Sequence, residues 1–151
     1  MNIAFFGLLD AFNLGHVGGV NSIVRRLATN LAKSGDDVAL VYYGCAEDKH
    51  YTVVPGVNAI HHRTFRDALL CLESGYEHIL TVYLLPNDRL SYAKFRRAKS
   101  KVAKFHHLYL GWNESFIKRQ LMFGESRLFP FNGCLFCISP RIYHYVSTWS
   151  K

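Results

Sequence analysis

Short apolar runs of strand length alternate along this chain with segments whose apolar residues recur at helical spacing. This alternation constrains the fold more than any other feature, because runs that are apolar on both faces are typical of strands covered by helices on both sides. We therefore predict an α/β domain with a Rossmann-like, doubly wound, mostly parallel sheet and with helices on both faces. About six strands are expected, at 2–9, 37–44, 57–63, 78–85, 102–110 and 134–139.

Helices are expected between these strands. In the first helix, apolar residues from Ile23 to Ala32 form one stripe at helical spacing. Asn21 or Ser22 is its expected N-cap, and Gly35 is its expected end. Further helices are expected at 64–75, at 86–100, at 113–124 and from 140 onward.

A glycine-bearing loop joins the first predicted strand to the first predicted helix, and Gly18 and Gly19 stand near the start of that helix. Backbone N–H groups at a helix start lack intrahelical partners, and glycine lets an anion approach them closely. The G-x-G-x-x-G and Walker patterns of other nucleotide-binding loops are absent. A phosphate site at these glycines is the functional interpretation, and a structural turn is the alternative. Because ligands of doubly wound sheets bind beyond the carboxyl ends of the strands, the site is expected to draw on 9–21, 83–88, 106–113 and Ser139.

Length and charge narrow the class of protein. The chain has 151 residues, enough for one domain with a core of its own, and its formal net charge of +7 favours anionic partners such as phosphates, nucleic acid or an acidic membrane. No apolar run approaches the roughly 18 residues of a membrane span, and the start lacks the basic segment of a signal peptide. A cytoplasmic location is therefore expected.

Four cysteines are too few for a disulfide scaffold and fit a reducing compartment. Cys134 and Cys137 have the spacing of a zinc or redox pair, but they fall on a predicted strand, where residues three apart face opposite sides. No second Cys or His pair stands at zinc-finger spacing. Both cysteines are therefore expected in the core, and neither a metal site nor a cofactor is predicted.

The order "IAFFG", a long loop, then "GGVNSIVRRLATNLAKSGDDVALV" resembles the start of glycosyltransferase family 4, retaining enzymes of the GT-B architecture. The likeness continues in "FHHLYLGW" and "LFCISPRIYHYV"; it covers most of the chain and is most specific in the first 45 residues. It implies that residues 1–151 are the N-terminal, acceptor-side domain of a two-domain enzyme. The nucleotide-sugar domain, with the family's paired glutamates in E-x7-E spacing, would follow and is not part of this sequence. The resemblance also implies that no bound metal is needed.

The resemblance implies ligand contacts near the first helix. Gly18 and Gly19 match the family's Gly-Gly, which lies against the donor's phosphates. Asn21 and Ser139 are further candidate contacts to donor or acceptor. For Asn21, a capping role is the alternative.

A histidine near the end of a later strand contacts the transferred sugar in this family. His107 is the residue expected to take this catalytic role, and His106 is the alternative, because neighbouring residues on a strand face opposite sides. His61 and His62 match no position of the family and are expected on the surface.

A basic segment, 94–104, contains no acidic residue. A solvated helix face is the ordinary explanation of such a run. The functional alternative is a contact of Arg96, Arg97 and Lys99 with an anionic membrane face, at about 1 kcal/mol per basic residue. Nucleic acid is not an expected partner, because no sheet with interleaved aromatic and basic residues is predicted.

The expected reaction moves a sugar from a nucleotide-diphosphate sugar to a hydroxyl of a saccharide or lipid-linked acceptor. This chain alone is expected to be inactive, because half of the site would be missing. Two alternatives remain open at this level: a standalone module that binds a phosphorylated ligand at Gly18 and Gly19, and a scaffold domain without catalysis.

Overall fold

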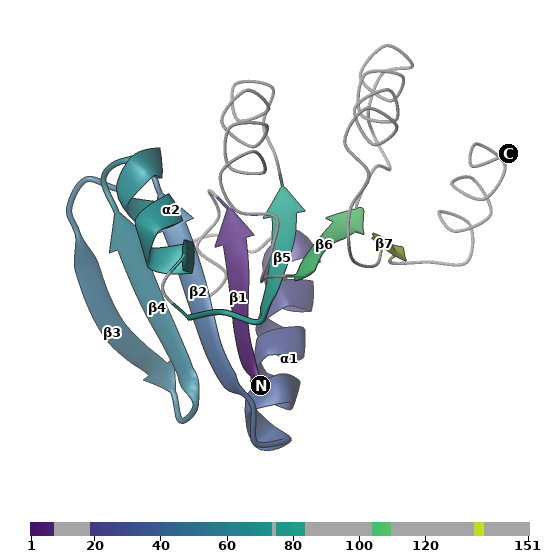
Figure 1. Ribbon diagram of the computed structural model, residues 1–151. Helices are drawn as coiled ribbons and strands as arrows, with labels where there is room; N and C mark the ends of the chain where they lie inside the picture. Colours follow the sequence, from purple (N-terminus) through teal and green to yellow (C-terminus); the bar gives the residue numbers. More distant parts are fainter. Residues whose placement is uncertain (8–18, 74, 84–103, 110–134, 138–151) are drawn as a thin grey trace, which may run out of the picture.

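The computed structural model describes residues 1–7, 19–73, 75–83, 104–109 and 135–137, which form one mixed α/β arrangement (Figure 1). A seven-stranded sheet lies between two helices. The predicted α/β class with a mostly parallel sheet is therefore confirmed. In chain order, the elements are β1 (Asn2–Gly7), α1 (Gly19–Lys33), β2 (Asp37–Tyr43), β3 (Lys49–Val54), β4 (Val57–His62), α2 (Phe65–Glu73), β5 (His78–Tyr83), β6 (Lys104–Tyr109) and β7 (Leu135–Cys137).

The strands lie in the order β3-β4-β2-β1-β5-β6-β7, so the chain begins in the interior of the sheet. It first adds strands on one side of β1 and then, from β5 onward, on the other side. Every neighbouring pair is parallel except the antiparallel hairpin of β3 and β4. All six predicted strands fall on observed ones, and among the strands that the structure describes, the edge strand β3 was not predicted.

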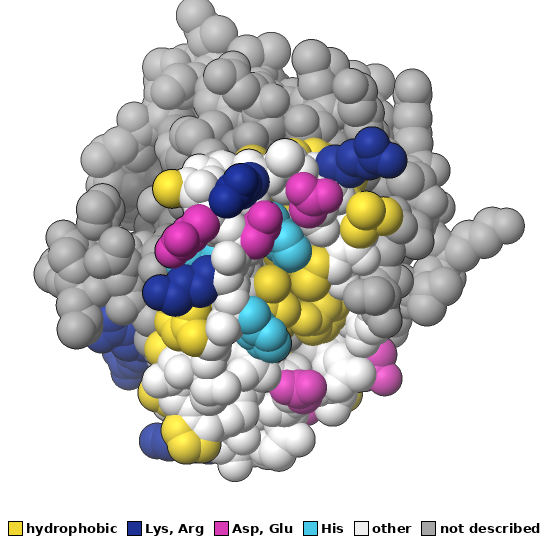
Figure 2. Space-filling model, turned by 90° about the vertical axis from the view of Figure 1, so that its left-hand side faces the viewer, with side chains coloured by type: hydrophobic (Ala, Val, Ile, Leu, Met, Phe, Trp, Pro, Cys, Tyr) yellow, Lys and Arg dark blue, Asp and Glu magenta, His cyan; other side chains and the backbone are white. Residues whose placement is uncertain are grey.

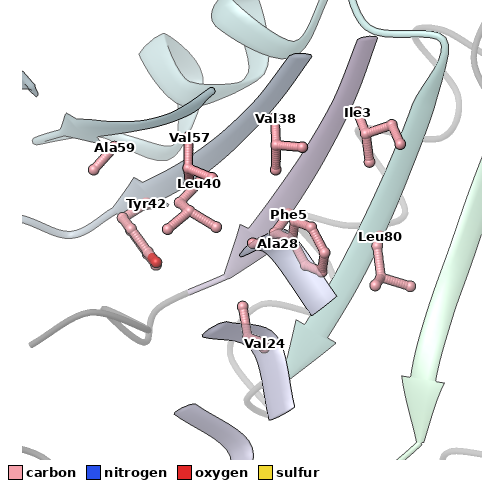
Figure 3. Packing of buried hydrophobic residues seen from close by; sticks show 10 residues of the cluster. All are labelled: Ile3, Phe5, Val24, Ala28, Val38, Leu40, Tyr42, Val57, Ala59 and Leu80. Carbon is pink, nitrogen blue, oxygen red and sulfur yellow. The ribbon is translucent and has the colours of Figure 1, made fainter. Parts of the chain in front are cut away.

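One face of the sheet is covered by α1 (Figure 3). Val24 and Ala28 of this helix pack on alternate residues of the central strands, among them Phe5 and Leu40. Burial of these apolar side chains stabilises the fold by roughly 25 cal/mol for each Å² removed from water. This face, called the α1 face below, thus holds the helix that follows the glycine loop.

The opposite face is covered by α2. Its buried residues Ala68 and Leu72 pack on the side chains that alternate with those of the first face, including Phe6 and Val41. Figure 1 shows α2 in front of the sheet and α1 behind it. The prediction of helices on both faces is confirmed for these two helices, whereas the helices expected at 86–100, at 113–124 and from 140 lie outside the described residues.

Two glycines with positive φ close the amino edge of the sheet. Gly35 ends α1 at φ +91°, as its sequence position indicated, and its N–H donates to the carbonyl of Ala32. Gly56, at φ +80°, makes the turn between β3 and β4, and a Cβ there would lie 3.1 Å from the Cβ of Ala32. The end of α1 and the hairpin therefore pack closely. Neither helix among the described residues combines the length and apolar character that a membrane crossing requires.

Candidate functional site

The candidate site begins where α1 starts. The helix begins at Gly19, two residues before Asn21, so the expected capping by Asn21 or Ser22 is wrong and both residues lie in the first turn. A polar side chain near a helix start indicates a cap, but here the helix extends further back into the glycine pair. The first turn carries no acidic residue. Gly18 lies outside the described residues.

In the described part of the chain, Asn21 is a buried polar side chain, with 6% of its surface exposed. It interacts with other groups of the protein. A buried amide that is satisfied within the protein avoids the cost of desolvation. This position favours a structural role for the Asn21 side chain in the first turn of α1.

The strand order reverses at β1, and this is the place where ligands bind in open α/β sheets. β1 ends at Gly7, which lies opposite Tyr42 of β2 on one side and Tyr83 of β5 on the other. The pairing with β5 shifts register between Phe6 and Gly7. The carboxyl ends of these three strands therefore meet at one edge of the sheet, here called the carboxyl edge.

On the α1 face, the registers of four strands place residues in rows across the sheet. Two rows are apolar: one of Ile3, Val38 and Val57, and one of Phe5, Leu40, Ala59 and Tyr51. The third row, at the carboxyl edge, contains polar and charged side chains. We call it the carboxyl row; its members are Gly7, Tyr42, His61 and Lys49.

His61 lies in the carboxyl row between Tyr42 and Lys49, and its ring also contacts Tyr51 of the neighbouring row. Its ring centroid lies 5.4 Å from that of Tyr42 and 5.5 Å from that of Tyr51, both in edge-to-face arrangements. Its Nε2 is 3.5 Å from the Tyr51 hydroxyl. Lys49 Nζ stands 5.4 Å from the centroid of the Tyr51 ring. Along the row, the phenol of Tyr42, the imidazole of His61 and the ammonium group of Lys49 therefore follow one another on neighbouring strands.

His61 and His62, expected on the surface, are both partly buried. His61 packs on the α1 face. On the other face, His62 Nδ1 lies 3.8 Å from a carboxylate oxygen of Asp48. Two neighbouring histidines on a strand face opposite sides, so their adjacency in sequence says nothing of a shared role.

Asp48 holds the loop between β2 and β3 against the end of β4. Its Oδ1 accepts a 2.8 Å hydrogen bond from the backbone N–H of Arg63, and its Oδ2 lies 3.9 Å from Arg63 Nε. The N–H of Cys45 donates to the carbonyl of His62 in the same region. Figure 2 shows acidic, basic and histidine side chains gathered on this side of the molecule. The exposed pair of Asp48 and Arg63 adds little stability, about 0–1 kcal/mol, but these contacts order the loop that precedes Lys49.

His106 and His107 lie on β6, where the sequence placed them. His106 is opposite Leu80 of β5, and His107 is opposite Thr81 of β5 and Leu135 of β7. The strand continues to Tyr109, so both histidines stand near its carboxyl end. The choice of His107 over His106 stays a prediction. Four other candidate residues lie outside the described part of the chain: Arg96, Arg97, Lys99 and Ser139.

Cys71 and Tyr76 are partly buried, and both pack against the core under α2. Burial raises the pKa of the Cys71 thiol, and a hydrogen bond with Tyr76 opposes that rise. Burial also raises the pKa of Tyr76, to about 12. A thiol held protonated is a poor nucleophile and a poor metal ligand. Within the described ranges, no group of three or more His, Cys, Asp or Glu residues is arranged to hold a metal ion.

Tyr42, Lys49 and His61 were not predicted as site residues from the sequence. Each stands at or next to an end of its strand, and that shared position is the signal that could have grouped them. No protein-family model matches this chain, and no curated protein matches its sequence. Function is therefore inferred from the residues and their arrangement.

Proposed function

We propose that this chain is the N-terminal, acceptor-side half of a retaining glycosyltransferase of the GT-B architecture, with a Rossmann-like, doubly wound fold. The strand order is the observation that carries the proposal. Without the antiparallel β3, the parallel strands lie in the order β4-β2-β1-β5-β6-β7. Counted along the chain, this is the 3-2-1-4-5-6 order of dinucleotide-binding sheets. The sequence resemblance over the first 45 residues supports the same choice.

In the proposed reaction, the bond between the sugar's anomeric carbon and a diphosphate oxygen breaks, and a bond to an acceptor hydroxyl oxygen forms. The departing nucleoside diphosphate takes up the proton that this hydroxyl loses. Gly18 and Gly19 offer backbone N–H groups to the donor's diphosphate, and α1 adds the partial positive charge of its N-terminus. His107 contacts the transferred sugar from β6. The nucleotide base and ribose would be held by a second domain that closes over this edge.

A second candidate is a module that binds a phosphorylated ligand without catalysis. The start of α1 favours it, because this helix begins with glycine and has no acidic residue in its first turn. A scaffold without any ligand is the remaining outcome of the tests.

A sugar-transfer assay separates these functions. The chain alone and the chain joined to a nucleotide-sugar-binding half are compared with a panel of radiolabelled donors and acceptors. We expect no transfer by the chain alone and transfer by the joined protein. Gly19→Val places a side chain where the backbone must approach the donor, so transfer is expected to fall by roughly 100-fold.

Gly75→Val is the matched control, since a Cβ at Gly75 meets nothing within 4 Å. It is expected to keep the transfer rate of the parent. Transfer by a folded Gly19→Val variant at the parent rate would contradict the role of the glycines. Absence of transfer over the whole panel would favour the binding module.

The basic segment adds a proposed peripheral contact with an anionic membrane. This part rests on the sequence, which places Arg96, Arg97 and Lys99 in a run without acids. We expect sedimentation with acidic vesicles at low salt that weakens as the Debye length falls from about 10 Å at 0.1 M salt to about 3 Å at 1 M. Reversal of the three charges to Glu is expected to abolish it. If the parent chain never sediments, the segment is only a solvated face.

A further inference from the structure

We draw no further inference here: the strongest candidate, the surface patch of partly buried apolar side chains that Ile60 of β4 and Phe65 and Leu69 of α2 contribute to the α2 face, carries no proposal, because nothing in the described part of the chain shows what covers it.

Discussion

The two faces of the sheet end differently at the carboxyl edge. On the α2 face, Phe6, Tyr43 and Phe65 form a closed group of rings, with centroids 5.0–5.8 Å apart. On the α1 face, the neighbouring Tyr42 is followed by His61 and then by an exposed lysine. Adjacent residues of β2 thus lead into an aromatic core on one side and into a polar row on the other.

The starts of α1 and α2 also differ. α2 is capped by its own sequence, because the Thr64 hydroxyl accepts a hydrogen bond from the Asp67 N–H and donates one to the Asp67 carboxylate. α1 begins at Gly19 and has no acid in its first turn. At this edge, the α2 face is therefore stabilised by its own helix cap and packed rings, and the α1 face is the one on which a ligand is expected.

Truncation of the aromatic group should have the largest effect on stability. Phe6 is fully buried, so Phe6→Ala removes its burial, leaves a cavity and is expected to cost about 3–5 kcal/mol. Urea unfolding measures the change. Leu70→Ala, at an exposed position on α2, is the control and should stay within about 0.5 kcal/mol. A loss of under 1 kcal/mol for Phe6→Ala would contradict the conclusion that the aromatic group stabilises the α2 face at this edge.

Removal of the α2 cap should have a smaller effect. Thr64→Ala deletes the hydroxyl that caps Asp67, at an expected cost of about 1 kcal/mol. The matched change on α1 is Ser22→Ala, which is expected to cost less because Ser22 lies within the first turn. Urea unfolding of both variants gives the comparison. If Ser22→Ala proves the costlier change, the two helix starts are not distinct in the proposed way.

The smallest expected effect is on the free energy of unfolding at alkaline pH, through Tyr76, which packs under α2. The pKa of Tyr76 is raised from 10 in the unfolded chain to about 12, first by burial and then by nearby Cys71 and Asp37. Because the folded state holds this proton more tightly, its contribution is complete below pH 10 and is lost as the pH rises from about 10 to about 12. Tyr76→Phe should therefore flatten the fall of stability in that window, as measured by unfolding at several pH values. An unchanged slope would place the alkaline sensitivity elsewhere.

Much of the sheet was predictable because the interior strands are apolar on both faces, as in "VALVYY" of β2. β3 was missed because an edge strand needs no apolar outer side, and its exposed Lys49 and His50 read as loop. The start of α1 was misplaced because the polar Asn21 fits the capping rule, although the side chain is buried in the first turn.

The candidate site was less predictable than the fold. The glycine pair is visible as a local pattern, but the carboxyl row joins residues from four strands. Tyr42, His61 and Lys49 become neighbours only through the pairing of β2, β4 and β3. Because His61 and His62 are adjacent in the sequence, the pattern does not show that only His61 belongs to the carboxyl row. Register is a property of long-range pairing, which a strand pattern alone does not determine.

The central claim is that ligand binds at the carboxyl edge on the α1 face. Amide NMR of the chain, titrated with nucleotide-diphosphate sugars up to their solubility limit, tests it most directly. We predict weak but localised shifts at Gly7, Gly19 and Tyr42, with no comparable shift at the start of α2. Shifts concentrated at Thr64 and Phe65, or at the amino edge of the sheet, would contradict it, and so would a spectrum that no member of the panel changes.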